Sequence, residues 1–213
     1  MLGFDVSERT ISRWMKRAPR DPELANRWLA FLRNHREAIA PMDFSTVPTL
    51  RFCVLFGFFV ISQHRRQILH FNVTKNPTSL WIVQQLREAF PIESAPRFLT
   101  FDRDGKYGVD VPAAVRSLKI IQVRTSLESP WQNGIAERWV EGCRHDLLGH
   151  VIAVNEHHLK RLLSEHLRYY HEDRTHLGLG KGTPRGRTRS TASGHVISHD
   201  RLGGLHHRYD RAA

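Results

Sequence analysis

The chain has 213 residues, of which 40% are hydrophobic and 25% charged; these values are typical of a globular protein and exclude a disordered one. Its formal net charge of +11 favours a polyanionic partner, most commonly nucleic acid. The longest apolar run, residues 52–61, is too short to span a bilayer, and no signal peptide precedes it. We therefore expect no membrane partner and a cytoplasmic location, associated with the nucleoid if the source is bacterial. Cys53 and Cys143 are expected to be free thiols and give no zinc site.

The N-terminal residues 4–18 predict a short helix with an apolar and a basic face. Its basic residues could contact a phosphate backbone; those taken as candidate DNA contacts are Arg13, Lys16 and Arg17. The pattern resembles the recognition helix of a helix-turn-helix, but the chain begins too late to supply the helices that normally precede one. A partial DNA-binding module and a plain amphipathic helix both stay open. A second helix, over residues 23–38, completes an expected N-terminal region of residues 1–40.

From residue 41 the pattern changes to alternating strands and helices. The predicted strands are 42–46, 52–61, 67–73, 97–102 and 119–123, and the predicted helices between them are 77–90 and 112–118. Strand 52–61 is almost wholly apolar, which indicates burial on both faces, and its short polar turn to the next strand predicts an antiparallel hairpin. Strands followed by strand–helix–strand alternation predict an α/β domain with a mixed five-stranded sheet, over residues 41–172.

The last third of the chain is helical and then basic. Helical spacing predicts a helix from Ile135 to about Val151, and another capped by Asn155. From residue 174 onward there are eight Lys or Arg and two Asp, so this stretch contributes +6 of the +11. We expect residues 173–213 to form a poorly ordered extension that binds phosphate groups.

Glu137 lies at the edge of the apolar stripe of the helix that starts at Ile135. Arg144, seven residues later, lies within about 20° of it and roughly 10 Å further along the axis. Taken alone, Glu137 is most simply a surface residue. The motif Pro130-x-x-Asn133-Gly134-x-x-Glu137, with Arg144 following, nevertheless resembles the third-carboxylate region of DDE transposases of the retroviral-integrase type. Most similar are the integrase-core transposases of bacterial insertion sequences.

This resemblance runs from about Phe31 to Pro184 and implies an RNase H-like fold. It implies three catalytic and metal-binding carboxylates, which map onto Asp43, Asp102 and Glu137. Two Mg²⁺ (or Mn²⁺) ions about 3.5–4 Å apart are the implied cofactors, because hard cations prefer carboxylate and water oxygens. Asp43 would bridge the ions. The implied partners are DNA, as transposon ends and target, and further copies of the chain.

Two further points concern the site residues. The resemblance places Arg144 near the DNA, and we take Asn133 as a second candidate DNA contact. The family usually has Gly two residues after the second Asp, whereas this chain has Asp104 there and Gly105 next. Since residues 102 and 104 would point the same way in a strand, Asp104 remains an alternative to Asp102.

The predicted function is a metal-dependent DDE recombinase that cleaves DNA 3′ ends and joins them to target DNA. The alternative is a truncated, non-autonomous or inactive DNA-binding relic of a transposase. An RNase H-type nuclease is disfavoured by the turn that precedes Glu137.

Overall fold

The computed structural model describes residues 22–91, 94–126, 129–187 and 193–212. The chain divides into two compact units, residues 1–35 and 36–213. In the first, helix α2 (Pro22–His35) carries Trp28 and Phe31 with their ring centroids 5.4 Å apart. The predicted helix over residues 4–18, with Arg13, Lys16 and Arg17, lies outside the described residues. None of the described helices is long and apolar enough to cross a membrane.

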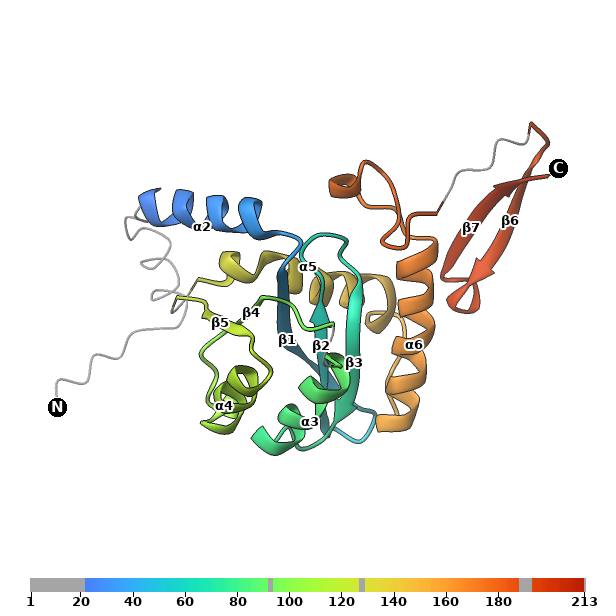
Figure 1. Cartoon of the computed structure of the whole chain (residues 1–213). Helices are drawn as coiled ribbons and strands as arrows, with labels where there is room; N and C mark the ends of the chain where they lie inside the picture. The colour runs from blue at the N-terminus through green and yellow to red at the C-terminus, as the bar shows by residue number, and fades with distance from the viewer. Residues whose placement is uncertain (1–21, 92–93, 127–128, 188–192, 213) are drawn as a thin grey trace, which may run out of the picture. The chain divides into compact units, whose positions relative to one another are not determined.

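The second unit is built on a mixed five-stranded sheet, as predicted (Figure 1). Its strands, in chain order, are β1 (Ile39–Pro48), β2 (Val54–Ile61), β3 (Ile68–Thr74), β4 (Phe98–Phe101) and β5 (Ile121–Arg124). The order across the sheet is β3-β2-β1-β4-β5. The first three strands pair antiparallel, whereas β4 is parallel to β1 and β5 is parallel to β4. The central strand β1 therefore has an antiparallel neighbour on one side and a parallel neighbour on the other.

Helices cover both faces of this sheet and explain the apolar run of β2. Helices α3 (Ser79–Ala89) and α4 (Asp110–Ser117) pack on one face, and α5 (Gly134–Cys143) and α6 (Glu156–Glu172) on the other. Along β2, Phe58 and Val60 join the α3/α4 core, whereas Phe59 and Ile61 join the α5/α6 core. Successive side chains of a strand alternate between faces, so a strand covered on both faces must be apolar throughout.

The predicted helix from Ile135 to Val151 is interrupted by a change in helical geometry. The α-helical part ends at Cys143, and a single π-helical turn follows over Arg144–Leu148. This turn buries Asp146 and Leu147. After it, Asn155 caps α6 as predicted, with its side-chain oxygen accepting a hydrogen bond from the backbone N–H of His158 at 2.8 Å.

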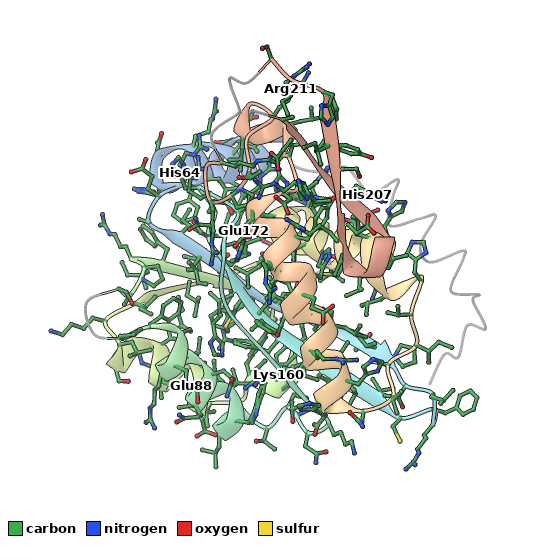
Figure 2. All side chains as sticks on the ribbon, turned by 90° about the vertical axis from the view of Figure 1, so that its right-hand side faces the viewer. His64, Glu88, Lys160, Glu172, His207 and Arg211 are labelled. Atoms are coloured by element: carbon green, nitrogen blue, oxygen red, sulfur yellow. The ribbon has the colours of Figure 1, made fainter. Side chains whose placement is uncertain are left out.

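The C-terminal stretch contains an ordered hairpin instead of the poorly ordered extension expected. Strands β6 (Val196–Arg201) and β7 (His206–Arg211) pair antiparallel, and the hairpin lies against α6 (Figures 1 and 2). The carboxylate of Asp173, whose side chain is 2% exposed, binds Arg201 at 2.7 Å and has Arg208 at 3.5 Å. Arg187 and Arg208 both bind Asp210. Several of the charges assigned to DNA are thus engaged within the chain.

His171 ties α6 to the edge strand β3, and this tie should make stability pH-dependent. Its Nε2 accepts a hydrogen bond from the backbone N–H of Ile68 at 2.9 Å, and burial, aided by Arg185, lowers the pKa of His171 to about 4. In the unfolded chain a histidine titrates near 6.5, so as the pH falls the unfolded state takes up the proton first. The stabilisation is full above pH 6.5 and is lost towards pH 4.

We expect His171→Gln to make the free energy of unfolding less dependent on pH between 6.5 and 4, as measured by urea denaturation. The other titrating groups contribute equally to the pH dependence of the variant and of the wild type, so the difference between the two reports on His171. The control is His157→Gln, the same change at an exposed position of the same helix. Equal pH slopes in all three proteins would contradict the assignment.

The hairpin should open more readily when Asp173 loses its charge. Asp173→Asn removes a buried partner of Arg201 and Arg208, so the opening free energy of the hairpin should fall by about 1.5 kcal/mol, as read from hydrogen exchange over residues 196–211. Glu165→Gln is the control, because Glu165 is an exposed acidic residue of α6 outside the hairpin. Unchanged exchange in Asp173→Asn would show that the hairpin is held by other contacts.

Candidate active site

The sheet topology brings the first two predicted carboxylates next to each other. In the parallel pair β1–β4, Ile39 lies opposite Phe98 and Pro41 opposite Thr100. Continuing this register by two residues places Asp43 beside Asp102, which directly follows the end of β4. Neighbouring strands are about 4.8 Å apart, so these two carboxylates belong to one site.

The third carboxylate comes from the start of α5. Met42 belongs to the α3/α4 core, so the next side chain along β1, Asp43, points to the face that carries α5. Asn133, which directly precedes α5, is 5% exposed and donates a hydrogen bond from Nδ2 to Oδ2 of Asp43 at 3.3 Å. Glu137 lies exposed in the first turn of the same helix. The turn before α5 therefore places Asn133 beside Asp43, and the first turn of α5 places Glu137 near it.

The electrostatics of Asp43 show that the three carboxylates act on one another. The pKa of Asp43 is raised to about 7, chiefly by burial and in smaller part by the negative charges of Asp102 and Glu137. A hydrogen bond from the backbone N–H of Phe44 to Oδ1, at 2.7 Å, and the charge of Lys106 oppose this rise. Burial and the two neighbouring carboxylates thus both disfavour a negative charge on Asp43.

The donor set fits a hard divalent cation, although it is not a closed cage. Within the described residues, no three Asp, Glu, His or Cys side chains lie close enough together to hold one ion. Carboxylate oxygens are, however, the ligands that Mg²⁺ and Mn²⁺ prefer. The Oδ1 atom of Asn133 is buried and has no hydrogen-bond partner among the described residues, which places one more oxygen beside Asp43.

Asp104 has a different environment from Asp102. Strand β4 ends at Phe101, so strand alternation does not orient either residue. Asp104 caps the 3₁₀ turn Gly105–Tyr107, and its carboxylate accepts from the backbone N–H of Lys106 at 2.9 Å and binds the Lys106 ammonium at 2.7 Å. Partial burial opposes the effect, but these Lys106 contacts lower the pKa of Asp104. Its carboxylate is already engaged, which favours Asp102 as the metal ligand.

Lys106 is a residue of the site that the sequence reasoning missed. Its ammonium lies 4.6 Å from the ring centroid of Phe44, the residue after Asp43. Asp104, two positions before it and three residues after the end of β4, is the signal that could have found it. Of the predicted DNA contacts, Arg144 is exposed at the start of the π turn, whereas Asn133 is buried against Asp43. DNA binding by either residue stays a prediction.

Comparison with known proteins agrees with this geometry. Residues 118–184 match the model of the family described as Integrase core domain. The fold is similar to that of a chain of the simian T-cell lymphotropic virus intasome in complex with PP2A regulatory subunit B56 gamma. There the TM-score is 0.56 and the identity 15%, covering 83% of this chain and 67% of that one. No curated protein matches the sequence.

Two catalytic cores described with magnesium are also similar. For the HTLV-2 integrase catalytic core domain in its dimeric form, the TM-score is 0.56 and the identity 11%, covering 71% of this chain and 95% of that one. For the Mos1 transposase catalytic domain with raltegravir and Mg, the TM-score is 0.59 and the identity 11%, covering 78% and 85%. The fold is that of an integrase core. The predicted RNase H-like architecture is confirmed; an origin in a bacterial insertion sequence stays a prediction.

A pair of substitutions tests whether Asp102 or Asp104 is the predicted second metal ligand. Loss of a ligand removes metal binding outright, whereas loss of a residue behind a ligand costs about 10–100-fold. Asp102→Ala should therefore show no DNA cleavage, and Asp104→Ala should show reduced but measurable cleavage. Asp110→Ala, at the exposed first position of α4, is the control and should cleave normally. The opposite order of activities would assign the ligand to Asp104.

Proposed function

We propose that the chain is a Mg²⁺-dependent DDE recombinase, which cleaves DNA 3′ ends and transfers them to target DNA. The observation that supports this most is the grouping of Asp43, Asp102 and Glu137 from three separate elements at one edge of an integrase-core fold. Two proteins with similar folds are described with magnesium, and a third as part of an intasome.

In this proposal Asp43, Asp102 and Glu137 would together hold the metal ions. Two ions would not require the three carboxylates to converge on a single point, in agreement with their open arrangement. When bound, the ions would supply positive charge to the phosphate oxygens and lower the pKa of an attacking water.

The chain's own contribution is to orient the first carboxylate. The amide of Asn133 holds Oδ2 of Asp43, and the backbone N–H of Phe44 holds Oδ1. Lys106, fixed by Asp104, adds a positive charge at the edge of the site. These contacts keep the orientation of Asp43 fixed although its burial and its neighbours disfavour a charge there.

The proposed partners are transposon ends and target DNA, bound by a homo-oligomer. Arg144, exposed seven residues after Glu137, is the proposed contact in the second unit. Arg13, Lys16 and Arg17 are proposed contacts of the N-terminal unit. An assembly of several copies is proposed because similar cores are described in an intasome and as a dimeric form.

Asp43→Asn should abolish cleavage and leave DNA affinity nearly unchanged, because the lost group holds metal and contacts no base. Nicking of supercoiled plasmid in Mg²⁺ measures the reaction without knowledge of the terminal repeats. Mg²⁺ should also raise the Tm of the wild type, since a ligand at 100 times its Kd stabilises by about 2.7 kcal/mol. Asp43→Asn should lose this shift, and the exposed Asp200→Asn should keep it.

The alternative function is DNA binding without chemistry. A wild-type protein that binds DNA but neither nicks plasmid nor gains stability from Mg²⁺ would be such a DNA-binding relic. Cleavage by Asp43→Asn at the wild-type rate would reject the assignment of the carboxylates.

A further inference from the structure

Two buried histidines beside α5 carry unpartnered ring nitrogens. His166, on α6, is 0% exposed, and within the described part of the chain neither of its nitrogens has a hydrogen-bond partner. His176 is 6% exposed, and its Nε2 also lacks a partner there. Buried polar atoms nearly always have partners, so such atoms mark a place where water or a ligand completes the structure.

Both histidines line a small cavity of about 50 Å³, walled also by Trp139 and Tyr170. One water needs roughly 10–15 Å³ of such volume, so the cavity has room for a few waters or one tetrahedral oxyanion. It shares wall residues, among them Arg66 and His176, with a wider cleft of about 990 Å³ that is also lined by Arg208 and Tyr209 of the hairpin. A small group in the cavity could therefore belong to a longer molecule that lies in the cleft.

The charges around the cavity favour an anion. Arg66, Arg138 and Arg174 line both the cavity and the cleft, and Asp146 is the carboxylate that lines the cavity with them. Arg174 neutralises Asp146 through a contact of 2.7 Å, which leaves Arg66 and Arg138 in excess.

The cleft has further acidic residues, but they do not reverse this balance. Asp173 is engaged by Arg201 and Arg208. Of the carboxylates that line the cleft, this leaves the negative charge of Glu141, which is balanced by the positive charges of Arg187 and Arg208. Guanidinium groups bind tetrahedral and planar oxyanions through paired N–H donors. A cation would meet net repulsion here.

The histidines complete this donor set in their neutral form. Burial lowers the pKa of His166 and of His176 to about 4, so each is neutral at pH 7 and has one N–H to donate. Two guanidiniums and two imidazole N–H groups around a cavity of this size match the oxygens of one phosphate group.

The position of Arg66 depends on a glycine. Arg66 lies in the turn between β2 and β3, with a φ of 59°. A Cβ atom added at Gly178 would collide with the Arg66 guanidinium. Glycine at 178 thus leaves the space that this guanidinium occupies.

The cavity is distinct from the carboxylate site. Ile135, Arg138, Trp139 and Gly142 line it and are spaced so that they share one side of α5. Glu137 is rotated by about 100° from Arg138 around the helix axis. We propose that this cavity is a phosphate-binding pocket, which takes either free phosphate or one backbone phosphate of a nucleic-acid strand lying in the outer cleft. The inference goes beyond the proposed function, and the pocket does not require catalysis.

Calorimetric titration of the full chain with inorganic phosphate tests the pocket directly. The titration is run in EDTA, with NaCl holding the ionic strength constant, so that metal-bound phosphate cannot contribute. The wild type should bind one phosphate. Arg66→Gln and Arg138→Gln should each weaken binding about tenfold, the usual effect of losing a charge-assisted hydrogen bond.

One variant tests the position of the Arg66 guanidinium without changing a charge, and another distinguishes the pocket from the carboxylate site. Gly178→Ala should weaken phosphate binding without changing any charge, because it displaces the Arg66 guanidinium. Arg87→Gln, an exposed arginine of α3, is the matched control and should bind as the wild type does. Asp43→Asn should also bind phosphate normally, so a failure of the proposed function would leave this result standing.

A fluorescent single-stranded oligonucleotide distinguishes the two sources of phosphate. Displacement of the oligonucleotide by phosphate, lost in Arg66→Gln, would identify a backbone phosphate as the ligand. Phosphate binding without such competition would identify free phosphate. The pocket is rejected if the wild type binds no phosphate, or if the Arg66 and Arg138 variants, folded by circular dichroism, bind it as Arg87→Gln does.

Discussion

The register of β1 is the constraint on which the candidate site depends. Parallel pairing with β4 sets Asp43 beside Asp102, and the alternation of side chains along β1 turns Asp43 towards α5. A slip by one residue would exchange Asp43 with Met42, moving the carboxylate into the α3/α4 core. Packing opposes that slip, since each side chain of β1 would have to fit the core on the opposite face and Asp43 would enter an apolar one. The register of β1 thus determines both the packing of the core and the geometry of the site.

Charges are paired to different extents at the candidate site and at the C-terminal hairpin. At the candidate site, three carboxylates oppose one another around a buried Asp43, and the partners present offset only part of that cost. At the C-terminal hairpin the reverse holds, because Asp173 and Asp210 gather arginines that the net charge of +11 alone would assign to DNA. Net charge alone therefore does not reveal which cations are available to a partner.

The sequence predicted what depends on local pattern. Alternation and apolar runs identified all five strands of the sheet, and the spacing around Glu137 identified the helix that carries it. What it missed depends on contacts between distant residues. The hairpin is stabilised by Arg201 and Asp173, 28 positions apart, and the role of Asn133 appears only when Asp43, 90 positions earlier, lies next to it. Neither contact leaves a periodic signal in the sequence.

The π turn shows how the segment after α6 becomes part of the core. A π turn inserts one residue into a helix, which rotates everything after it by about 100° relative to a continuous α-helix. In this chain Asp146 lies buried within the turn, and its carboxylate meets Arg174 at 2.7 Å. That contact ties the segment after α6 to the α5 region and brings His176, two residues later, to the wall of the cavity. Arg174 and His176 therefore hold their places through contacts with the region of α5 and the turn that follows it.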